Sequence, residues 1–229
     1  MNIFLKLLLI AILSNASIQA AFAQPKPTYA ISSRISIGGE GSWDYLTMDT
    51  PSLRLFVSHS TTVNVVNVDT HVVVGSIPAN GIHGIALAPS LNKGFISNGR
   101  DSSVTVFNLK ALEVLTVIRG TGANPDAILF ESMTERIFTF NGRSKDATVI
   151  DAKTLAIVAT IPLGGKPEFA ATDGKGTVFV NIEDKNQISV INAKTATVEK
   201  QWSLCPHSTC RHSPSVPISR RRHGGLSQL

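Results

Sequence analysis

Apolar and polar residues alternate in short runs along most of this chain. The clearest stretch holds four such runs, at 125–130, 136–140, 147–150 and 156–161. Each run has the length of a strand, is rich in β-branched and aromatic residues, and is bounded by Gly, Asn, Asp or Pro. No helical period of comparable length follows residue 24. The pattern therefore predicts antiparallel β-structure with little helix.

This four-strand unit occurs four times. A Val-rich run that ends in a turn recurs at steps of 41, 43 and 41 residues, closing at Asn67, Asn108, Asp151 and Asn192. A period near forty with four strands per unit is typical of a β-propeller blade. We predict an all-β propeller of four-stranded antiparallel blades, and the blades span 43–80, 82–121, 124–164 and 166–204. In the first blade the strands are expected near 44–49, 53–58, 63–68 and 72–77.

Equivalent positions in the repeats predict the core and the turns. A phenylalanine occupies the same place on the second strand of every unit, at Phe56, Phe95, Phe138 and Phe179. Because large apolar residues in strands are normally buried, we expect these side chains to pack between blades. The Asn-Gly pairs at 98–99 and 141–142 predict hairpin turns in which both residues take a positive φ.

Four short segments of the repeat are distinctive: 83–89 (HGIALAP), 94–98 (GFISN), 104–108 (VTVFN) and 164–168 (GGKPE). On these segments the repeat resembles the YVTN-type β-propeller repeat of YncE-like secreted bacterial proteins, and the resemblance extends over about 31–204. It implies a propeller that usually has seven blades. The same class includes quinoprotein-like dehydrogenase subunits, so the resemblance is specific for fold and weak for function.

The two ends of the chain differ from the repeats. Residues 1–23 are expected to be a signal peptide, with Lys6, a short apolar core and an Ala-x-Ala site before Gln24. The protein is therefore expected to be exported, to the periplasm or the extracellular space of a bacterium, with no transmembrane anchor after cleavage. Residues 31–38 match a fourth strand and predict the closing strand of a last blade.

Residues 205–229 are basic and contain no acidic or aromatic residue. Two interpretations stay open, a disordered basic tail of a four-blade protein or a frameshifted end of a seven-blade parent, and the second is preferred. A truncated product would expose apolar faces and is expected to self-associate.

Charge gives no support for nucleic-acid binding. The net charge of +5 includes Lys6 and four arginines after residue 204. Without these five residues, 16 basic and 16 acidic residues remain, so the propeller portion is neutral. A broad basic face for nucleic acid is not predicted.

No dedicated metal or cofactor site is predicted either. The two cysteines, Cys205 and Cys210, lie in the final segment with His207 and His212, at a spacing too tight for a zinc finger. The sequence contains no nucleophile elbow, phosphate-binding glycine loop or His-Glu-x-x-His motif. His59 and His71 are interpreted as surface residues. No cofactor and no catalytic residue is assigned.

One set of polar residues is a candidate site. Asp44, His83, Asp126 and Glu168 share one place in the four repeats, just before the strand expected to be innermost in each blade. At the channel mouth they would bind a cation or a polar ligand, or act as an acid and base. The simpler interpretation is that each side chain ties its blade to the neighbouring blade through backbone N–H groups at the loop, since polar residues at turns usually serve the turn.

The expected role is a non-catalytic binding module for an unknown protein or small ligand. The alternative is a propeller enzyme, a quinoprotein-like dehydrogenase subunit or a lactonase.

Overall fold

The computed structural model describes residues 29–39 and 41–204. Residues 41–204 contain sixteen strands and three short 3-10 turns, η1 (Thr50–Ser52), η2 (Pro89–Leu91) and η3 (Glu183–Lys185). No helix in the described part of the chain has the length and apolarity needed to cross a membrane. The signal peptide and the basic segment predicted at the two ends lie outside the described residues.

The strands form four separate antiparallel sheets, each a simple meander of four consecutive strands. The first sheet contains β1 (Trp43–Asp49), β2 (Arg54–His59), β3 (Thr62–Asn67) and β4 (Val72–Pro78). The second contains β5 (Ile82–Ala88), β6 (Lys93–Asn98), β7 (Ser103–Asn108) and β8 (Val114–Arg119). The third contains β9 (Pro125–Glu131), β10 (Arg136–Asn141), β11 (Asp146–Asp151) and β12 (Ile157–Pro162). The fourth contains β13 (Pro167–Thr172), β14 (Thr177–Ile182), β15 (Gln187–Asn192) and β16 (Thr197–Ser203).

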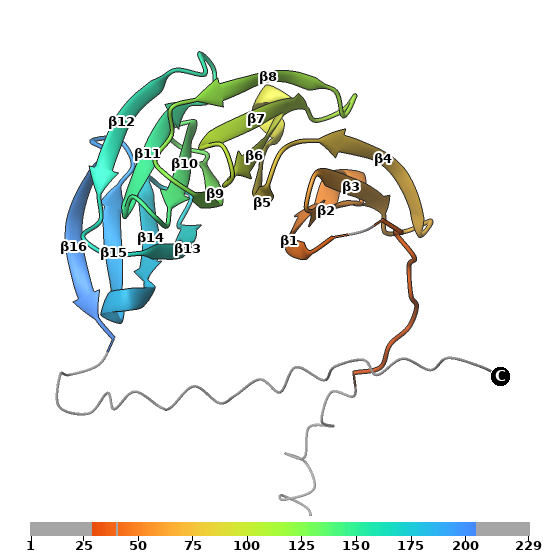
Figure 1. The fold of residues 1–229 in the computed structure, drawn as a ribbon, viewed down its shortest axis with the longest axis horizontal. Helices are drawn as coiled ribbons and strands as arrows, with labels where there is room; N and C mark the ends of the chain where they lie inside the picture. Colours follow the sequence, from red (N-terminus) through yellow and green to blue (C-terminus); the bar gives the residue numbers. More distant parts are fainter. Residues whose placement is uncertain (1–28, 40, 205–229) are drawn as a thin grey trace, which may run out of the picture. The chain divides into compact units, whose positions relative to one another are not determined.

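The sheets are the blades of a β-propeller, as the repeat predicts, and we call them blades 1 to 4. Figure 1 shows them following one another around an arc, with the first strand of each blade on the inner side and the fourth on the outer side. The inner strands β1, β5, β9 and β13 contact one another in that order. The arc is open between blade 1 and blade 4.

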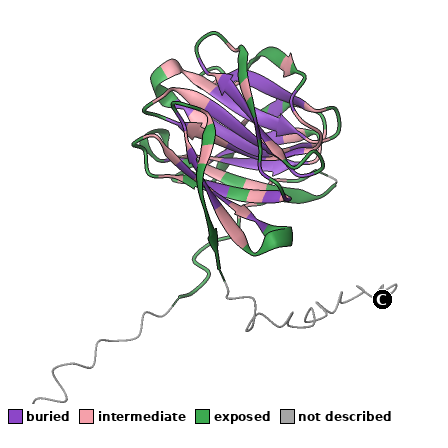
Figure 2. Ribbon diagram, turned by 90° about the vertical axis from the view of Figure 1, so that its left-hand side faces the viewer, coloured by how far each residue is buried: buried purple, intermediate pink, exposed green. Residues whose placement is uncertain are grey.

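The core lies between blades, because one sheet cannot bury both of its own faces. Three apolar clusters fill the three blade interfaces, and each includes one of the recurrent phenylalanines, Phe56, Phe95 or Phe138. These three side chains are fully buried. Figure 2 shows that buried residues concentrate in the strands and exposed residues in the loops. The expected blade-to-blade packing is confirmed at these three positions, whereas Phe179 is only half-buried.

Two local predictions were wrong. Residues 31–38, expected to be a closing strand, have no strand structure. An edge strand needs hydrogen-bonding partners, and the described residues contain no fifth blade to supply them. The Asn-Gly hairpins do not take a positive φ at their Asn-Gly pairs; the left-handed residues are Ser102 and Lys145 instead.

The asparagines of these hairpins are buried and serve as hydrogen-bond donors. Asn98 Nδ2 donates to Ser103 Oγ and Thr105 Oγ1, at 2.9 Å each. Asn141 Nδ2 donates to Asp146 Oδ1 at 2.6 Å and to Thr148 Oγ1 at 3.0 Å. The side-chain amide therefore ties the hairpin together across the strand pair, which explains why asparagine recurs there.

Candidate functional site

The four predicted site residues each stand second in the first strand of a blade, inside the strand rather than before it. At this point every one of the four strands has an irregular register against its neighbour, between residues 43 and 46, 82 and 85, 125 and 128, and 167 and 170. A β-bulge re-aims side chains and is common next to functional sites. The repeat therefore includes a bulge that sets the direction of Asp44, His83, Asp126 and Glu168.

Polar side chains on the second strand hold these irregular segments in place. Ser58 Oγ accepts a hydrogen bond from Tyr45 N at 2.6 Å, and Ser97 Oγ accepts one from Gly84 N at 2.8 Å. In blade 4 the acceptor is Asn181 Oδ1, 2.7 Å from Phe169 N. In three blades, the backbone N–H group that the bulge takes out of the strand pairing therefore donates to a side-chain oxygen of the second strand.

Three of the four predicted residues converge. His83 Nδ1 lies 2.7 Å from Asp44 Oδ2 and 3.7 Å from Asp126 Oδ1. One ligand atom from each residue lies within 4.8 Å of the others. The three residues come from blades 1, 2 and 3, so the propeller brings together groups that are about forty residues apart in sequence. We call Asp44, His83 and Asp126 the mouth triad.

Glu168 is not part of the mouth triad. Its carboxylate lies 3.4 Å from Lys166 Nζ, and the same lysine also contacts Glu183. All four residues contact other side chains, whereas the simpler interpretation of the sequence expected them to bind backbone N–H groups that link neighbouring blades. The bulges direct Asp44, His83 and Asp126 toward one another across blade boundaries, whereas Glu168 contacts Lys166 in the turn before its own strand.

Burial and neighbouring carboxylates raise the pKa values of two acidic groups at the mouth. Burial raises the pKa of Asp126, and Asp44 raises it further while His83 opposes the shift. Burial also raises the pKa of Glu168, with a further contribution from Asp126. Carboxylates crowded together in a partly buried site favour a proton or a cation as counter-ion.

Tyr45 is a member of this site that the sequence analysis missed. Burial raises the pKa of its phenol, and Asp126, Asp44 and Glu168 each add to the shift. The phenol therefore stays protonated at neutral pH and available as a hydrogen-bond donor. Its ring also stacks on Phe169 of blade 4, with centroids 6.1 Å apart. The sequence signal for Tyr45 is its position directly after Asp44. Regular alternation along a strand would turn the Tyr45 side chain away from the site, so the signal was not used.

His59 was wrongly interpreted as a surface residue. It is buried, and its ring stacks on Trp43 at 3.7 Å between centroids. His71 is exposed, as expected. His59 faces away from blade 2 with Trp43, so it does not join the mouth triad.

A cavity of about 400 Å³ adjoins the mouth triad. His83 forms part of its wall, together with Asn124 and two arginines of the hairpin loops, Arg100 and Arg143. Its lining includes no carboxylate, so a ligand with a negative group could reach the imidazole from this side.

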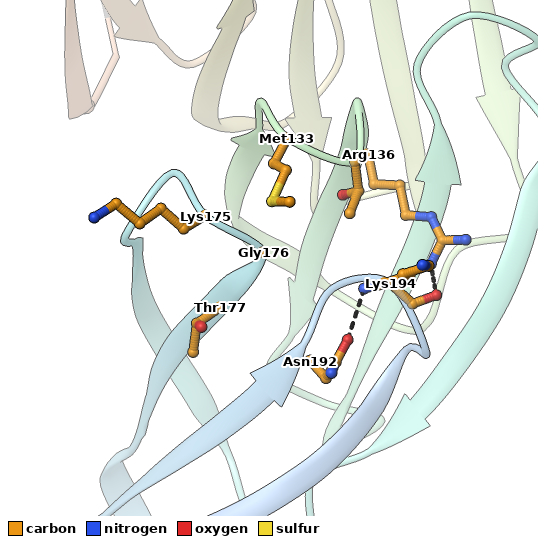
Figure 3. Close-up of a pocket in the computed structure, with 8 residues that line it drawn as sticks. Met133, Arg136, Lys175, Gly176, Thr177, Asn192 and Lys194 are labelled. Atoms are coloured by element: carbon orange, nitrogen blue, oxygen red, sulfur yellow. Dashed lines mark hydrogen bonds between the residues drawn. The ribbon is translucent and has the colours of Figure 1, made fainter.

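A larger cavity of about 520 Å³ lies between the turns of blades 3 and 4, at the strand ends opposite the mouth triad (Figure 3). Its lining contains Arg136, Lys175 and Lys194. Arg136 Nη1 is already engaged, since it donates to the carbonyl groups of Ala193 and Lys194 at 2.6 and 3.0 Å. Lys175 points away from the other two cations in Figure 3. The cavity therefore lies where two blades meet at the surface, and its three cationic side chains do not converge on one point.

Gly84 controls how closely the inner strands approach at the site. A Cβ atom at this position would lie 3.0 Å from both the carbonyl oxygen of Asp126 and the nitrogen of Ile128. We expect Gly84→Ala to lower the free energy of unfolding by about 1–3 kcal/mol, because it forces β5 and β9 apart. Urea denaturation followed by circular dichroism measures this loss, and an unchanged midpoint would show that the strands can separate freely.

Comparison with known proteins adds support for the fold. No family model matches the sequence, and no curated protein matches it. Among solved structures, a chain of hydrazine synthase from Kuenenia stuttgartiensis is similar, with a TM-score of 0.64 and 17% sequence identity. The alignment covers 76% of this chain and 52% of that one, so this chain spans about half the length of its structural neighbour. At this identity the likeness establishes the propeller fold alone.

Proposed function

We propose that this protein is an exported, YVTN-like β-propeller that acts as a non-catalytic binding module and holds a divalent cation at its channel mouth. One observation carries the proposal: Asp44, His83 and Asp126 converge from three blades, with ligand atoms within 4.8 Å of one another. One imidazole and two carboxylates form a donor set that suits first-row transition metals.

The distances within the mouth triad are compatible with such an ion. Ligand atoms about 2.0–2.2 Å from a metal ion are about 3.0 Å apart in octahedral coordination and about 3.4 Å apart in tetrahedral coordination. The separations of His83 from Asp44 and Asp126 are 2.7 Å and 3.7 Å, and all three ligand atoms lie within 4.8 Å of one another, so side-chain rotations would bring them to one ion. The adjoining cavity lined by Arg100 and Arg143 then leaves room for a ligand or a partner group beside the ion.

Manganese is the best probe of this site. Zinc favours thiolates, which the full chain offers at Cys205 and Cys210, whereas carboxylate ligands suit Mn²⁺. We expect electron paramagnetic resonance to detect one bound Mn²⁺ per chain. His83→Ala and Asp126→Asn should each weaken binding at least tenfold.

Two matched variants control for the loss of a histidine or a carboxylate elsewhere. His71→Asn and Asp69→Asn change exposed residues on the turn between β3 and β4 and should bind Mn²⁺ like the parent. Equal binding by all five proteins, or no binding by the parent, would rule out the mouth triad as a cation site.

An enzyme is the second candidate. The contact between His83 Nδ1 and Asp44 Oδ2 would orient the imidazole as a general base, which is the arrangement found in many hydrolases. If the chain hydrolyses lactones without added metal and loses that activity in Asp44→Asn, the enzymatic function replaces the binding one.

A further inference from the structure

Blades 1 and 4 each present a face that their repeat equivalents bury. On the inner strand, Leu46 occupies the place of Ile85, Ile128 and Ala170, which pair with the second strand in the same register. The equivalents are 5%, 9% and 7% exposed, whereas Leu46 is 65% exposed. The difference arises because Leu46 is on the side of blade 1 that no other blade covers among the described residues.

The same comparison holds at the other end of the arc. Phe56, Phe95 and Phe138 are fully buried by the blade that follows them. Phe179, at the equivalent place in blade 4, is only half-buried and stacks on Trp202, with ring centroids 5.9 Å apart. Trp202 is 48% exposed on the same side of the sheet. We call Phe179 and Trp202 the trailing face and Leu46 with Met48 the leading face.

The leading and trailing faces correspond to the two sides of the interfaces between blades inside the chain. At every interface inside the chain, the phenylalanine face of one blade packs against the face of the next blade that includes the Leu46 equivalent. Phe56 and Ile85 share one cluster, Phe95 and Ile128 a second, and Phe138 and Ala170 a third. The trailing face of one molecule therefore presents apolar residues of the kind that pack against the Leu46 equivalents inside the chain.

We propose that two copies of this chain associate head to tail, each placing its trailing face on the leading face of the other. The two contacts are equivalent and close a ring of eight blades, which is within the usual range for propellers of about four to eight. Closure by a twofold axis limits the assembly to a dimer, because no free face remains. The arc in Figure 1 is open between the blades that carry these two faces.

Charge substitutions on each face distinguish the head-to-tail dimer from association through other surfaces. In analytical ultracentrifugation we expect the parent to sediment at twice the chain mass. Leu46→Glu and Phe179→Glu should each raise the dissociation constant at least a hundredfold, because each chain contributes both faces. Val158→Glu, on the outer strand β12, changes an apolar residue whose exposure lies between those of Phe179 and Leu46, away from both faces, and should remain dimeric.

A double variant with opposite charges on the two faces distinguishes loss of the contact from loss of folding. The double variant Leu46→Lys, Phe179→Glu places opposite charges on the two faces and should recover the dimer at low salt. Failure of this rescue with intact circular dichroism would overturn the proposed contact. So would a parent that is monomeric or forms open-ended oligomers, or dimers that only one of the two Glu variants disrupts. A monomeric parent would point instead to further blades or another protein on these faces.

Discussion

Replacing Phe138 with alanine should lower the free energy of unfolding by about 3–5 kcal/mol. The side chain is fully buried between blades 3 and 4, in the cluster that contains Val178, Val180 and Ile191. Its removal leaves a cavity that two rigid sheets cannot close, so the loss exceeds the transfer free energy of the ring alone. Urea denaturation monitored by circular dichroism at 25 °C measures it.

Phe179→Ala is the matched control, because it makes the same change at the equivalent place in blade 4. Both substitutions are made in the Leu46→Glu background so that association does not contribute to stability. The expected loss at Phe179 is about 1 kcal/mol, since this side chain is only half-buried and loses its ring stack with Trp202. Equal losses at the two positions would mean that blade 4 is covered within the monomer.

The fold was predictable because four copies of one pattern agree. A single run such as 136–140 is compatible with several structures, but four equivalent phenylalanines at a period near forty require stacked sheets. Their burial follows from the repeat alone in blades 1 to 3. The exposure of Phe179 depends on the absence of a following blade from the described residues, which the same reasoning anticipates.

The site was only partly predictable. The equivalent places of Asp44, His83, Asp126 and Glu168 are visible in the sequence, because a shared strand position implies a shared face. The separation of Glu168 from the other three is not visible, because it depends on the contact with Lys166 across a turn. Tyr45 was missed because the bulge that directs it breaks the alternation on which sequence reasoning depends.

The burial of individual polar residues could not be predicted from the sequence either. His59 ends a strand and has the local pattern of a surface residue, yet Trp43 covers its ring. That contact joins two residues whose register is fixed only after β1 and β2 pair. Asn98 and Asn141 were assigned to the turn for their backbone freedom, although their side-chain amides are what the hairpins use.

A buried carboxylate between blades 3 and 4 is expected to make a large contribution to the free energy of unfolding. Glu131 is fully buried. It accepts hydrogen bonds from Met133 N at 3.1 Å, Thr134 N at 2.8 Å, Thr134 Oγ1 at 2.6 Å and Gly176 N at 3.2 Å. The last of these donors is in blade 4, so one side chain closes its own turn and joins two blades.

Glu131→Gln should lower the free energy of unfolding by about 2–4 kcal/mol at pH 7. The amide keeps the size of the side chain but has one acceptor oxygen and presents an NH₂ group toward N–H donors. Glu135→Gln is the control, since Glu135 makes a partly exposed ion pair with Lys153 whose loss should cost at most about 1 kcal/mol.

The effect of Glu131→Gln should depend on pH in a defined direction. Burial alone would raise the pKa of Glu131, but the hydrogen bonds from Thr134, Met133 and Gly176 outweigh it, so the pKa in the folded state is below the usual 4.5. A carboxyl group with a depressed folded pKa contributes its full stabilisation above its unfolded pKa and loses it as the pH falls through the folded value. The difference in unfolding free energy between the parent and Glu131→Gln should therefore be constant from pH 7 to about pH 5 and shrink below about pH 4.5. Urea midpoints measured for both proteins between pH 3 and pH 7 test this, and a difference that grows as the pH falls would show that Glu131 is held protonated in the folded protein.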